Sequence, residues 1–464
     1  MSKKLIKNAD WIITMDEDKR RLRRSDVLID GAEIVALGKN LISEEDVDEI
    51  IDAIGKIIIP GMVNTHHHCF QSLVRNIHVA NELSLMPWLK VVYNIFQDIT
   101  PEVADAGALI GLGELLKSGC TTSMDHHYAF PRSTDKKLID VTINAAQKLG
   151  IRFQPTRGSL SIGGGHIPDS LVETVDDILI DSERLIKTYH DNSKFSMLQV
   201  DLSPCWPEYD VPELWDESMK MAKKYGVGCH SHLAESKDEV EYCLEKFNCR
   251  PAEYVYRKGW MGPRVWFAHS VHLTDSDIEL FAKTGTGIAH CPISNMKLNS
   301  GICRVPNLID AGVNIGIGVD GAASNNASNM LSEIRVSYLM HQLQYGNKGP
   351  NAEKILEMAT VGGAKVLGRT DIGYLAPGMA ADMVLIDWNQ FELAGGQNDP
   401  VSVVVMSGDS KMVNTVLVNG EVVVEEGKLV NIDEENTAVE VNKIAKNMLR
   451  KASVREKGLE LDLR

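Results

Sequence analysis

The sequence predicts an α/β fold, a (β/α)₈ TIM barrel with a small β-sandwich domain that the N- and C-terminal segments build together. Both ends of the chain carry short strand patterns, and the stretch between them alternates apolar runs with helix-length segments. The length of 464 residues suits such a barrel, which takes roughly 250 to more than 400 residues with insertions. We place the first part of the sandwich domain at residues 1–58, the barrel at 59–372, and the second part of the sandwich domain with a terminal helix at 373–464.

The two β-rich ends are expected to share one small domain. Near the N-terminus, strand patterns occur at residues 11–14, 27–29 and 33–37. Near the other end they occur at 381–387 and 413–418, and Asn419-Gly420 is a strong hairpin signal before 421–424. Chain ends are often close in space, so one sheet domain built from both ends is reasonable.

The middle of the chain supplies eight strand candidates. They are residues 57–59, 121–124, 152–154, 198–200, 226–232, 265–268, 287–289 and 313–319. Helix-length segments lie between them, among them 101–117, 139–149, 212–224, 236–247 and 276–283. Alternating strands and helices favour a closed barrel over an open doubly wound sheet, because no G-x-G-x-x-G follows a strand to mark a dinucleotide site.

Composition limits the expected partners. The net charge of −16 disfavours nucleic acid and anionic membranes, because both need a basic surface. No stretch approaches the roughly 20 apolar residues of a membrane-spanning helix, and the N-terminus lacks the apolar core of a signal peptide. None of the eight cysteines forms a C-x-x-C pair, so we expect buried thiols rather than disulfides. These features predict a cytoplasmic protein.

Polar side chains follow several of the predicted strands. His66 and His68 are two positions apart, which puts both side chains on one face of an extended chain and turns His67 away. The other strand ends supply His232 with Glu235 three residues later, His269 and Asp320. Because the chemistry of a (β/α)₈ barrel lies at the C-terminal ends of its strands, these side chains should converge.

The residue types in this set match a metal site. Histidine and aspartate are ligands of divalent metals such as zinc, and three histidines with one aspartate leave a position for a water that the metal acidifies. Glu235 would reach over the metal as a general acid and base. A single histidine at a strand end is more often a buried structural residue. Four strand ends that each supply a ligand-type residue favour the metal site.

Several motifs resemble the amidohydrolase superfamily over essentially the whole chain. They lie at residues 60–68 (PGMVNTHHH), 232–235 (HLAE), 268–269 (AH), 290–295 (HCPISN), 318–321 (GVDG) and 373–382. The chain resembles the mononuclear aminohydrolase branch, because the strand at 198–202 has no lysine to bridge two metals. This resemblance implies one Zn²⁺ per chain, with Fe²⁺ as an alternative, bound by His66, His68, His232 and Asp320.

The same resemblance implies catalytic roles. Glu235 is expected to carry a proton from water to a ring nitrogen and then to the leaving amine, and Asp320 to accept a proton from the water. His269 is expected beside the attacking water, and the histidine at this position is sometimes counted as a metal ligand in the superfamily. Both roles stay open for His269.

A narrower resemblance indicates the substrate class. Residues 66–68 with 71–73, 157–161, 203–205, 230–232 and 294–298 are similar to 8-oxoguanine deaminases and to hydroxytriazine aminohydrolases. The implied reaction is metal-dependent hydrolytic deamination of an amino-substituted N-heterocycle, 8-oxoguanine or a related 2-amino-4-oxo pyrimidine-type ring, with release of ammonia. Hydroxytriazine N-alkylaminohydrolysis and deamination of guanine or isoxanthopterin are alternatives, followed by cyclic amide hydrolysis and a non-catalytic scaffold. Chlorohydrolase relatives lose the aspartate of the eighth strand, so Asp320 argues against dehalogenation.

Three residues are candidates for binding the heterocyclic substrate. Gln71 offers amide hydrogen-bonding groups, and Arg157 would hold a ring oxygen by charge-assisted hydrogen bonds. Trp88 would form a wall of the pocket. Each has a purely structural alternative. Gln71 would then be an amide on a helix surface, Arg157 a solvated arginine in a salt bridge, and Trp88 a tryptophan of the hydrophobic core.

Other aromatic residues leave the exact substrate open. Trp206 departs from the smaller residue that the resemblance to 8-oxoguanine deaminases implies, and His126 and His127 would line the pocket mouth or cap the second strand. Barrels of this kind often pair, so we expect a homo-oligomer.

Overall fold

The computed structural model describes residues 2–134 and 137–455 and contains the predicted closed barrel. Its eight parallel strands close in the order β10-β11-β12-β13-β14-β6-β8-β9. They are β6 (Met62–Asn64), β8 (Cys120–His127), β9 (Arg152–Ser159), β10 (Asp201–Pro204), β11 (Cys229–Leu233), β12 (Val265–His269), β13 (Gly287–His290) and β14 (Ile315–Ile317).

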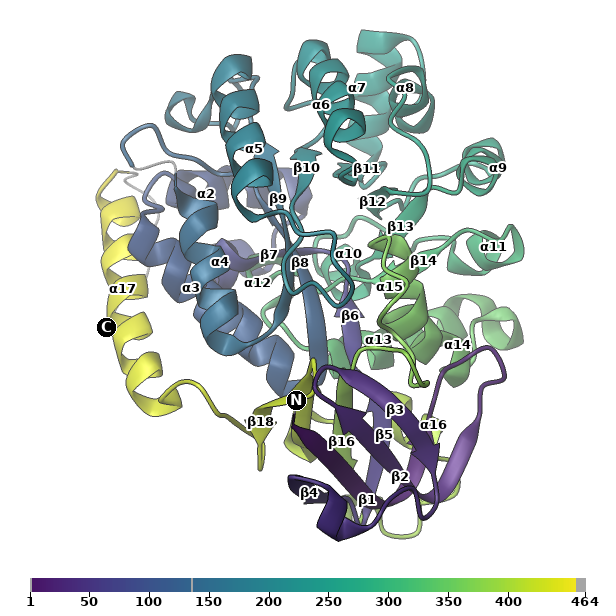
Figure 1. The fold of residues 1–464 in the computed structure, drawn as a ribbon. Coiled ribbons are helices and arrows are strands. Elements are labelled where there is room, and N and C mark those ends of the chain that lie inside the picture. Colours follow the sequence, from purple (N-terminus) through teal and green to yellow (C-terminus); the bar gives the residue numbers. More distant parts are fainter. Residues whose placement is uncertain (1, 135–136, 456–464) are drawn as a thin grey trace.

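Helices surround the barrel (Figure 1). They include α2 (Leu85–Phe96), α3 (Pro101–Lys117), α4 (Leu138–Leu149), α5 (Val175–Tyr189), α6 (Pro212–Tyr225), α7 (Lys237–Phe247), α8 (Pro251–Arg257), α9 (Asp275–Thr284), α11 (Val305–Asp310) and α13 (Met330–Tyr345). Helix α3 has the predicted bounds because Thr100 caps it, accepting from the backbone N–H of Val103, and Pro101 follows at the first helical position.

The first predicted barrel strand is wrong. Residues 57–59 lie in β5 (Lys56–Pro60), which pairs antiparallel with β16 (Met383–Asp387) outside the barrel. The barrel starts at β6 instead. A Cβ on Gly61, between β5 and β6, would lie 2.0 Å from Thr121 Oγ1, so only glycine fits where the chain passes from one sheet to the other. The fourth barrel strand also starts later than the predicted 198–200, at Asp201.

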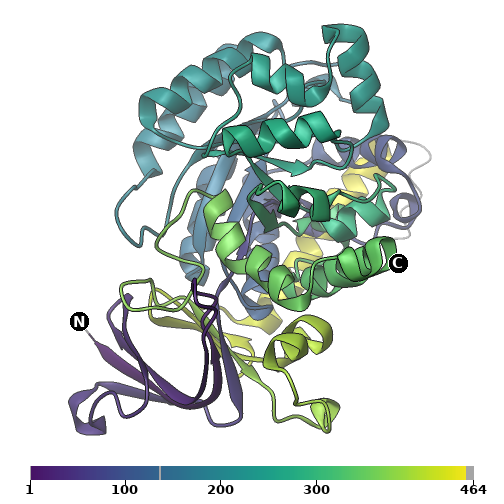
Figure 2. The ribbon, with the colours of Figure 1, turned by 90° about the vertical axis from the view of Figure 1, so that its right-hand side faces the viewer.

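Strands from both chain ends pair in one sheet, as expected. Its order is β19-β18-β17-β16-β5-β1-β2-β3, with β4 paired to β1. The strands not yet given are β1 (Lys3–Ile13), β2 (Arg21–Asp30), β3 (Glu33–Gly38), β4 (Glu49–Asp52), β17 (Val413–Val418), β18 (Glu421–Glu425) and β19 (Lys428–Leu429). Figure 2 shows this curved sheet beside the barrel. The structure thus shows that both chain ends form one hydrogen-bonded sheet. That this sheet closes into a sandwich stays a prediction, and so do the domain boundaries.

A buried ion pair joins this sheet to the barrel. The guanidinium of Arg152, at the start of β9, donates to both carboxylate oxygens of Asp382, at 3.0–3.2 Å. It also donates to the backbone carbonyls of Phe195 and Ser196. Because both charges are buried and hydrogen-bonded, this contact fixes how the chain enters β16.

The terminal helix α17 (Glu434–Arg455) packs against α2 and α3 of the barrel. Lys117 pairs with Glu434 at 2.6 Å near one end of the helix, and Arg455 pairs with Asp98 at 2.5 Å near the other. The C-terminal segment therefore leaves the terminal sheet and returns to the barrel.

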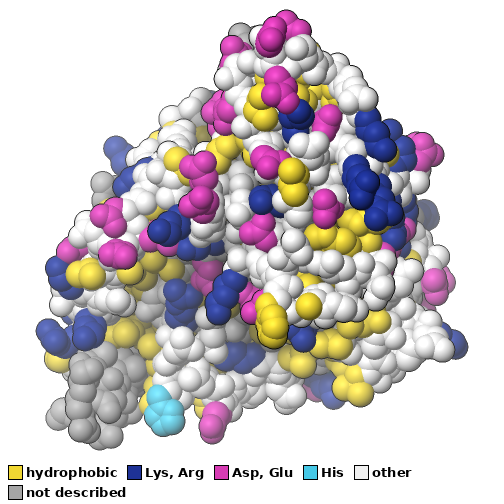
Figure 3. All heavy atoms as spheres, turned by 90° about the horizontal axis from the view of Figure 1, so that it is seen from below, with side chains coloured by type: hydrophobic (Ala, Val, Ile, Leu, Met, Phe, Trp, Pro, Cys, Tyr) yellow, Lys and Arg dark blue, Asp and Glu magenta, His cyan; other side chains and the backbone are white. Residues whose placement is uncertain are grey.

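Charged side chains of both signs are interspersed on the face shown in Figure 3. No helix in the described part of the chain is both long and apolar enough to cross a membrane. All eight cysteines lie in the described residues, buried and without disulfide bonds.

Candidate metal centre and active site

The predicted metal ligands converge at one end of the barrel. His66 follows β6, His232 lies in β11, and His68 ends the short strand β7 (His67–His68). Strand β7 pairs in parallel with β15 (Asp320–Gly321), so that Asp320 lies opposite His67 and beside His68. This two-stranded sheet joins the first and last strand ends of the barrel.

Distances between the ligand atoms match those around a metal ion. Asp320 Oδ1 lies 3.2 Å from His68 Nε2 and 3.3 Å from His66 Nε2, and His68 Nε2 lies 3.2 Å from His232 Nε2. Nitrogen ligands of a tetrahedral zinc ion, with bonds of about 2.0–2.1 Å, lie about 3.3–3.4 Å apart. His66 Nε2 is buried and has no hydrogen-bond partner. Ligand atoms of His66, His68 and His232, with His126, lie within 4.8 Å of one another, as do those of His66, His269 and Asp320, and such groups suit a divalent metal such as zinc.

Hydrogen bonds turn the ligand lone pairs inward. His68 Nδ1 lies 2.7 Å from the carbonyl of His126, and His232 Nδ1 lies 2.8 Å from that of Cys205. A carbonyl only accepts, so each Nδ1 carries the hydrogen and each Nε2 keeps a lone pair. Burial lowers the pKa of His232 well below its ordinary value, which keeps this ring neutral.

Asp320 is held as an anion. Burial alone would raise its pKa, but the adjacent imidazoles of His66 and His68 outweigh this and hold the pKa well below its ordinary value. Its second oxygen, Oδ2, accepts from the hydroxyls of Ser294 and Ser324. One carboxylate oxygen thus faces the histidines while the other is fixed by hydroxyl groups.

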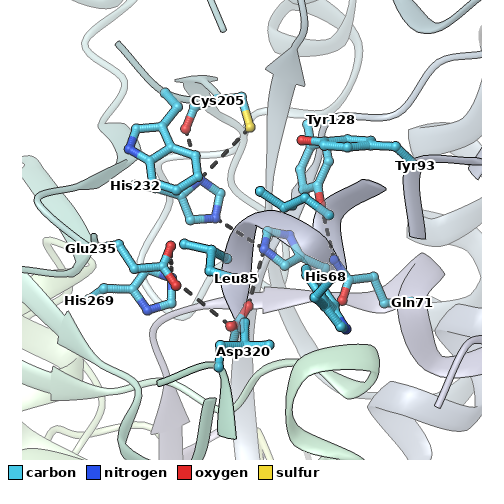
Figure 4. A pocket seen from close by; sticks show the side chains of 14 residues that line it. His68, Gln71, Leu85, Tyr93, Tyr128, Cys205, His232, Glu235, His269 and Asp320 are labelled. Carbon is cyan, nitrogen blue, oxygen red and sulfur yellow. Dashed lines mark hydrogen bonds and ion pairs between the residues drawn. The ribbon is translucent and has the colours of Figure 1, made fainter. Parts of the chain in front are cut away.

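Glu235 and His269 lie beside the ligands (Figure 4). Glu235 Oε2 is 3.6 Å from His269 Nε2, and Ser300 Oγ donates to Glu235 Oε1 at 3.2 Å. Burial raises the pKa of Glu235. Burial would lower the pKa of His269, but the carboxylates of Glu235 and Asp320 raise it overall. A carboxyl group with a raised pKa next to a metal site is suited to proton transfer.

His269 is held from its other side by Asn295. Its Nδ1 lies 2.8 Å from Asn295 Oδ1, and its Nε2 lies 4.0 Å from Asp320 Oδ2. One ligand-type atom of His269 also lies within 4.8 Å of those of His66 and Asp320. The position therefore suits a contact with the metal or with its water.

One supporting residue was missed by sequence reasoning. Glu239, in the first turn of α7, is fully buried, and its carboxylate accepts from the backbone N–H groups of Ala234 and Glu235, each at 2.8 Å. The pattern Ser236-x-x-Glu239 is a helix-capping signal that marked this glutamate. The side chain reaches back beyond the cap to the Glu235 backbone instead.

A small cavity lies between the metal site and α2. It is lined by His68, Gln71, Leu85, Trp88, Leu89, Tyr93, Tyr128, Cys205, Trp206, His232, Glu235, His269, Leu298 and Asp320. Its volume is about 30 Å³, room for about two water molecules. Its lining includes the proposed metal ligands His68, His232 and Asp320.

Two of the three predicted substrate-binding residues line this cavity. The Gln71 amide nitrogen donates to the Tyr128 hydroxyl at 3.1 Å, and Gln71 Oε1 is buried without a partner. A Cβ on Gly321 would lie 1.9 Å from Gln71 Oε1, so glycine is needed there to make room for the amide. Trp88 contributes its ring from α2.

Arg157 requires a correction, because the structure does not bring it to the cavity. Its guanidinium is fully buried, pairs with Glu173 at 2.9 Å and Asp181 at 3.1 Å, and lies 3.8 Å from the ring centroid of Phe130. Two carboxylates on the outer side of β9 hold it there. The N–H groups of the Arg157 guanidinium therefore bind these two carboxylates and not a substrate.

The remaining histidines near the site lie outside the cavity lining. His67 Nδ1 accepts from the backbone N–H of His68, which turns its ring away from the ligands. His127 Nε2 bonds the carbonyl of Ala129. His126 is buried against His232, with ring centroids 4.9 Å apart and no hydrogen-bond partner for either ring nitrogen.

Comparisons with known proteins identify the family. Residues 57–423 match the model of the amidohydrolase family. The chain is 40% identical to an 8-oxoguanine deaminase of Pseudomonas aeruginosa over 410 residues, which covers 88% of this chain and 91% of the relative. It is 36% identical to the hydroxydechloroatrazine ethylaminohydrolase of Pseudomonas sp. (strain ADP), with 91% of each chain covered.

A solved structure agrees in fold as well as sequence. The zinc complex of the atrazine chlorohydrolase from Arthrobacter aurescens TC1 superposes with a TM-score of 0.90 at 33% identity, covering 95% of this chain and 100% of the other. These matches confirm the predicted resemblance. The chain belongs to the amidohydrolase family.

Proposed function

We propose that this protein is a zinc-dependent hydrolase that removes the amino group of an N-heterocycle and releases ammonia. The preferred substrate is 8-oxoguanine or a related 2-amino-4-oxo pyrimidine-type ring. The main support is that Asp320 Oδ1 lies 3.2–3.3 Å from the Nε2 atoms of His66 and His68, with His232 Nε2 3.2 Å from His68 Nε2 and Glu235 beside them. The 8-oxoguanine deaminase relative supports the substrate class.

One zinc ion per chain would be bound by His66, His68, His232 and Asp320. When bound, zinc acts as a Lewis acid and lowers the pKa of water toward neutrality. The strand β10, with the sequence DLSP, has no lysine that would bridge a second ion. Fe²⁺ is the alternative metal, and elemental analysis of the purified enzyme distinguishes the two.

The protein's own groups move the protons. Glu235 accepts a proton from the attacking water, passes it to a ring nitrogen and then protonates the departing amine. Its raised pKa allows it both to accept and to donate this proton. Asp320 accepts the second proton of the water and passes it on to Glu235, which then has the proton that it gives to the amine. His269, fixed by Asn295, keeps its Nε2 directed between Glu235 and Asp320.

The cavity favours an uncharged planar substrate. None of the described residues that line it is a lysine or arginine, and half of them are leucine, tryptophan or tyrosine. The unpartnered Gln71 Oε1 is an acceptor for an N–H group of the ring. Trp88 would stack on or enclose that ring.

Hydroxytriazine N-alkylaminohydrolysis is the second candidate, supported by the relative that carries this activity. Deamination of guanine or isoxanthopterin involves the same ring geometry, and an isoxanthopterin deaminase is 34% identical to the chain. Cyclic amide hydrolysis is disfavoured by the lack of a lysine in β10. A scaffold role is disfavoured because all proposed ligands are present.

A substrate screen tests the proposal. Zinc-loaded enzyme is assayed by ultraviolet absorbance and ammonia release with 8-oxoguanine, isocytosine, guanine, isoxanthopterin and hydroxyatrazine. We expect turnover of at least one oxo-substituted amino heterocycle, with 8-oxoguanine preferred. No turnover of any of them by enzyme with full zinc content rejects the proposed function.

We also propose that the protein is a cytoplasmic homo-oligomer and that the sheet of the chain ends closes as a small sandwich. Light scattering of the purified protein tests the oligomer, and fractionation of the producing cell tests the location. A crystal structure tests the sandwich.

A further inference from the structure

A buried histidine beside the metal site has no role in the proposed chemistry. His230 lies on β11, two residues before His232, and its side chain is fully buried. Its Nε2 lies 2.8 Å from His66 Nδ1, and its Nδ1 lies 3.0 Å from the backbone carbonyl of Trp266 on β12. His66 and His230 thus share a hydrogen bond.

The direction of this hydrogen bond follows from the partners. The Trp266 carbonyl only accepts, so His230 Nδ1 carries a hydrogen. The ring is fully buried, and a neutral imidazole with its hydrogen on Nδ1 has its lone pair on Nε2, which is therefore the acceptor. His66 Nδ1 therefore donates, which leaves the lone pair of His66 on Nε2, the atom 3.3 Å from Asp320 Oδ1.

Trp266 holds His66 by a second route. The register of β11 and β12 places Trp266 opposite His230, and the two rings stack with centroids 4.8 Å apart. The Trp266 indole N–H donates to the carbonyl of Thr65, the residue before His66, at 3.1 Å. The backbone and the ring of His66 are therefore both anchored to the same pair of residues.

We propose that His230 is a positioning residue of the zinc site, which fixes the tautomer and orientation of His66. Metal-bound histidines usually donate their second N–H to a carboxylate, a carbonyl or water. His68 and His232 follow that pattern with carbonyl groups, whereas His66 uses a neutral imidazole. The inference rests on the proposed zinc site and is independent of the substrate.

Two amide substitutions separate the two hydrogen bonds of His230. The amide of His230→Gln reaches the position of Nε2 and accepts from His66. The shorter amide of His230→Asn reaches the position of Nδ1 and bonds only Trp266. Zinc affinity is measured on the holoenzyme by competition with a chromophoric chelator. We expect His230→Asn to bind zinc about 10–100-fold more weakly and His230→Gln to stay close to wild type.

A matched control removes a similar contact elsewhere. His341 Nε2 lies 3.1 Å from His290 Nε2, also fully buried, and neither ring is a proposed ligand. His341→Asn should leave zinc affinity unchanged. Thermal unfolding of each variant shows whether it is folded.

The proposal is overturned if His230→Asn binds zinc as wild type does, or if the glutamine and asparagine variants lose equal affinity. Should His230→Asn not fold, Trp266→Phe serves as the second test, because it removes only the indole bond to Thr65. Faster zinc release from Trp266→Phe supports the anchoring, and an unchanged rate overturns it. Failure of the wild-type protein to bind zinc would instead reject the proposed function.

Discussion

The carboxylate of Glu239 holds the backbone of Glu235. Glu239 Oε2 accepts the N–H of Glu235 while Oε1 accepts that of Ala234. Ala234 has a left-handed backbone, with φ of 51°, so the chain turns sharply just before Glu235. The clamp therefore sets the direction in which the proposed proton carrier leaves the chain.

Replacing Glu239 by glutamine should misplace Glu235. The amide accepts with one atom only, so one of the two N–H groups loses its acceptor. We expect kcat to fall by about 10- to 100-fold, the scale of effect that a small misplacement near the reacting atoms produces, while zinc content stays unchanged. Steady-state kinetics and metal analysis check this. Glu241→Gln, an exposed position on the same helix, should behave as wild type.

Glu235→Gln should keep zinc and lose activity. The amide has nearly the shape of the carboxyl group but cannot carry the proton, and general acid and base catalysis contributes about 10²–10⁴ in rate. Metal content and kcat are measured on the same preparation. A wild-type rate in this variant contradicts the assigned role.

His232→Ala should lose both metal and activity. The substitution removes one of the three imidazoles and leaves the Cys205 carbonyl without its ring partner. Zinc per chain is measured after gel filtration. Retention of full zinc content by the folded variant would remove His232 from the ligand set.

Arg157→Met should destabilise the protein rather than weaken substrate binding. It removes the guanidinium from the buried carboxylate of Glu173, whereas Asp181 keeps its ion pair with Arg184. Breaking a buried pair this way costs about 3–5 kcal/mol. Urea unfolding measures the loss. KM of Arg157→Lys, which keeps a positive charge, should match wild type; a large rise in KM without a loss of stability would restore the substrate contact.

Asp210 should make stability fall as pH rises. Burial raises its pKa to about 7, against about 3.9 in an unfolded chain. Between about pH 4 and pH 7 the folded state holds a proton that the unfolded state has released, so the free energy of unfolding decreases with rising pH. Urea unfolding at a series of pH values checks this. Asp210→Asn, which does not titrate, should flatten that slope.

Strand ends and histidine spacing predicted much of the site. The barrel and the convergence of His66, His68, His232 and Asp320 followed from where polar residues end apolar runs. The run at 57–59 was misplaced because a buried strand of either sheet has the same apolar pattern. The structure alone shows which sheet it joins.

Side-chain partners were the main part that the sequence did not reveal. Arg157 was expected at the substrate because a guanidinium can hold a ring oxygen. Its actual partners, Glu173 and Asp181, lie beyond the strand that carries it and were not evident from the sequence. His230 and His232 have the same two-residue spacing as His66 and His68, so the sequence could have indicated that the His230 side chain points into the barrel. Its hydrogen bond to His66 depends on how the strands are placed across the barrel.

The pairing of β5 with β16 has a consequence for synthesis of the chain. β5 is complete once Pro60 has left the ribosome, whereas its antiparallel neighbour β16 spans Met383–Asp387 and is translated after the whole barrel. During that interval one edge of an isoleucine-rich strand stays open, and such an edge invites pairing with other chains. The terminal sheet is therefore completed only after the barrel has been translated.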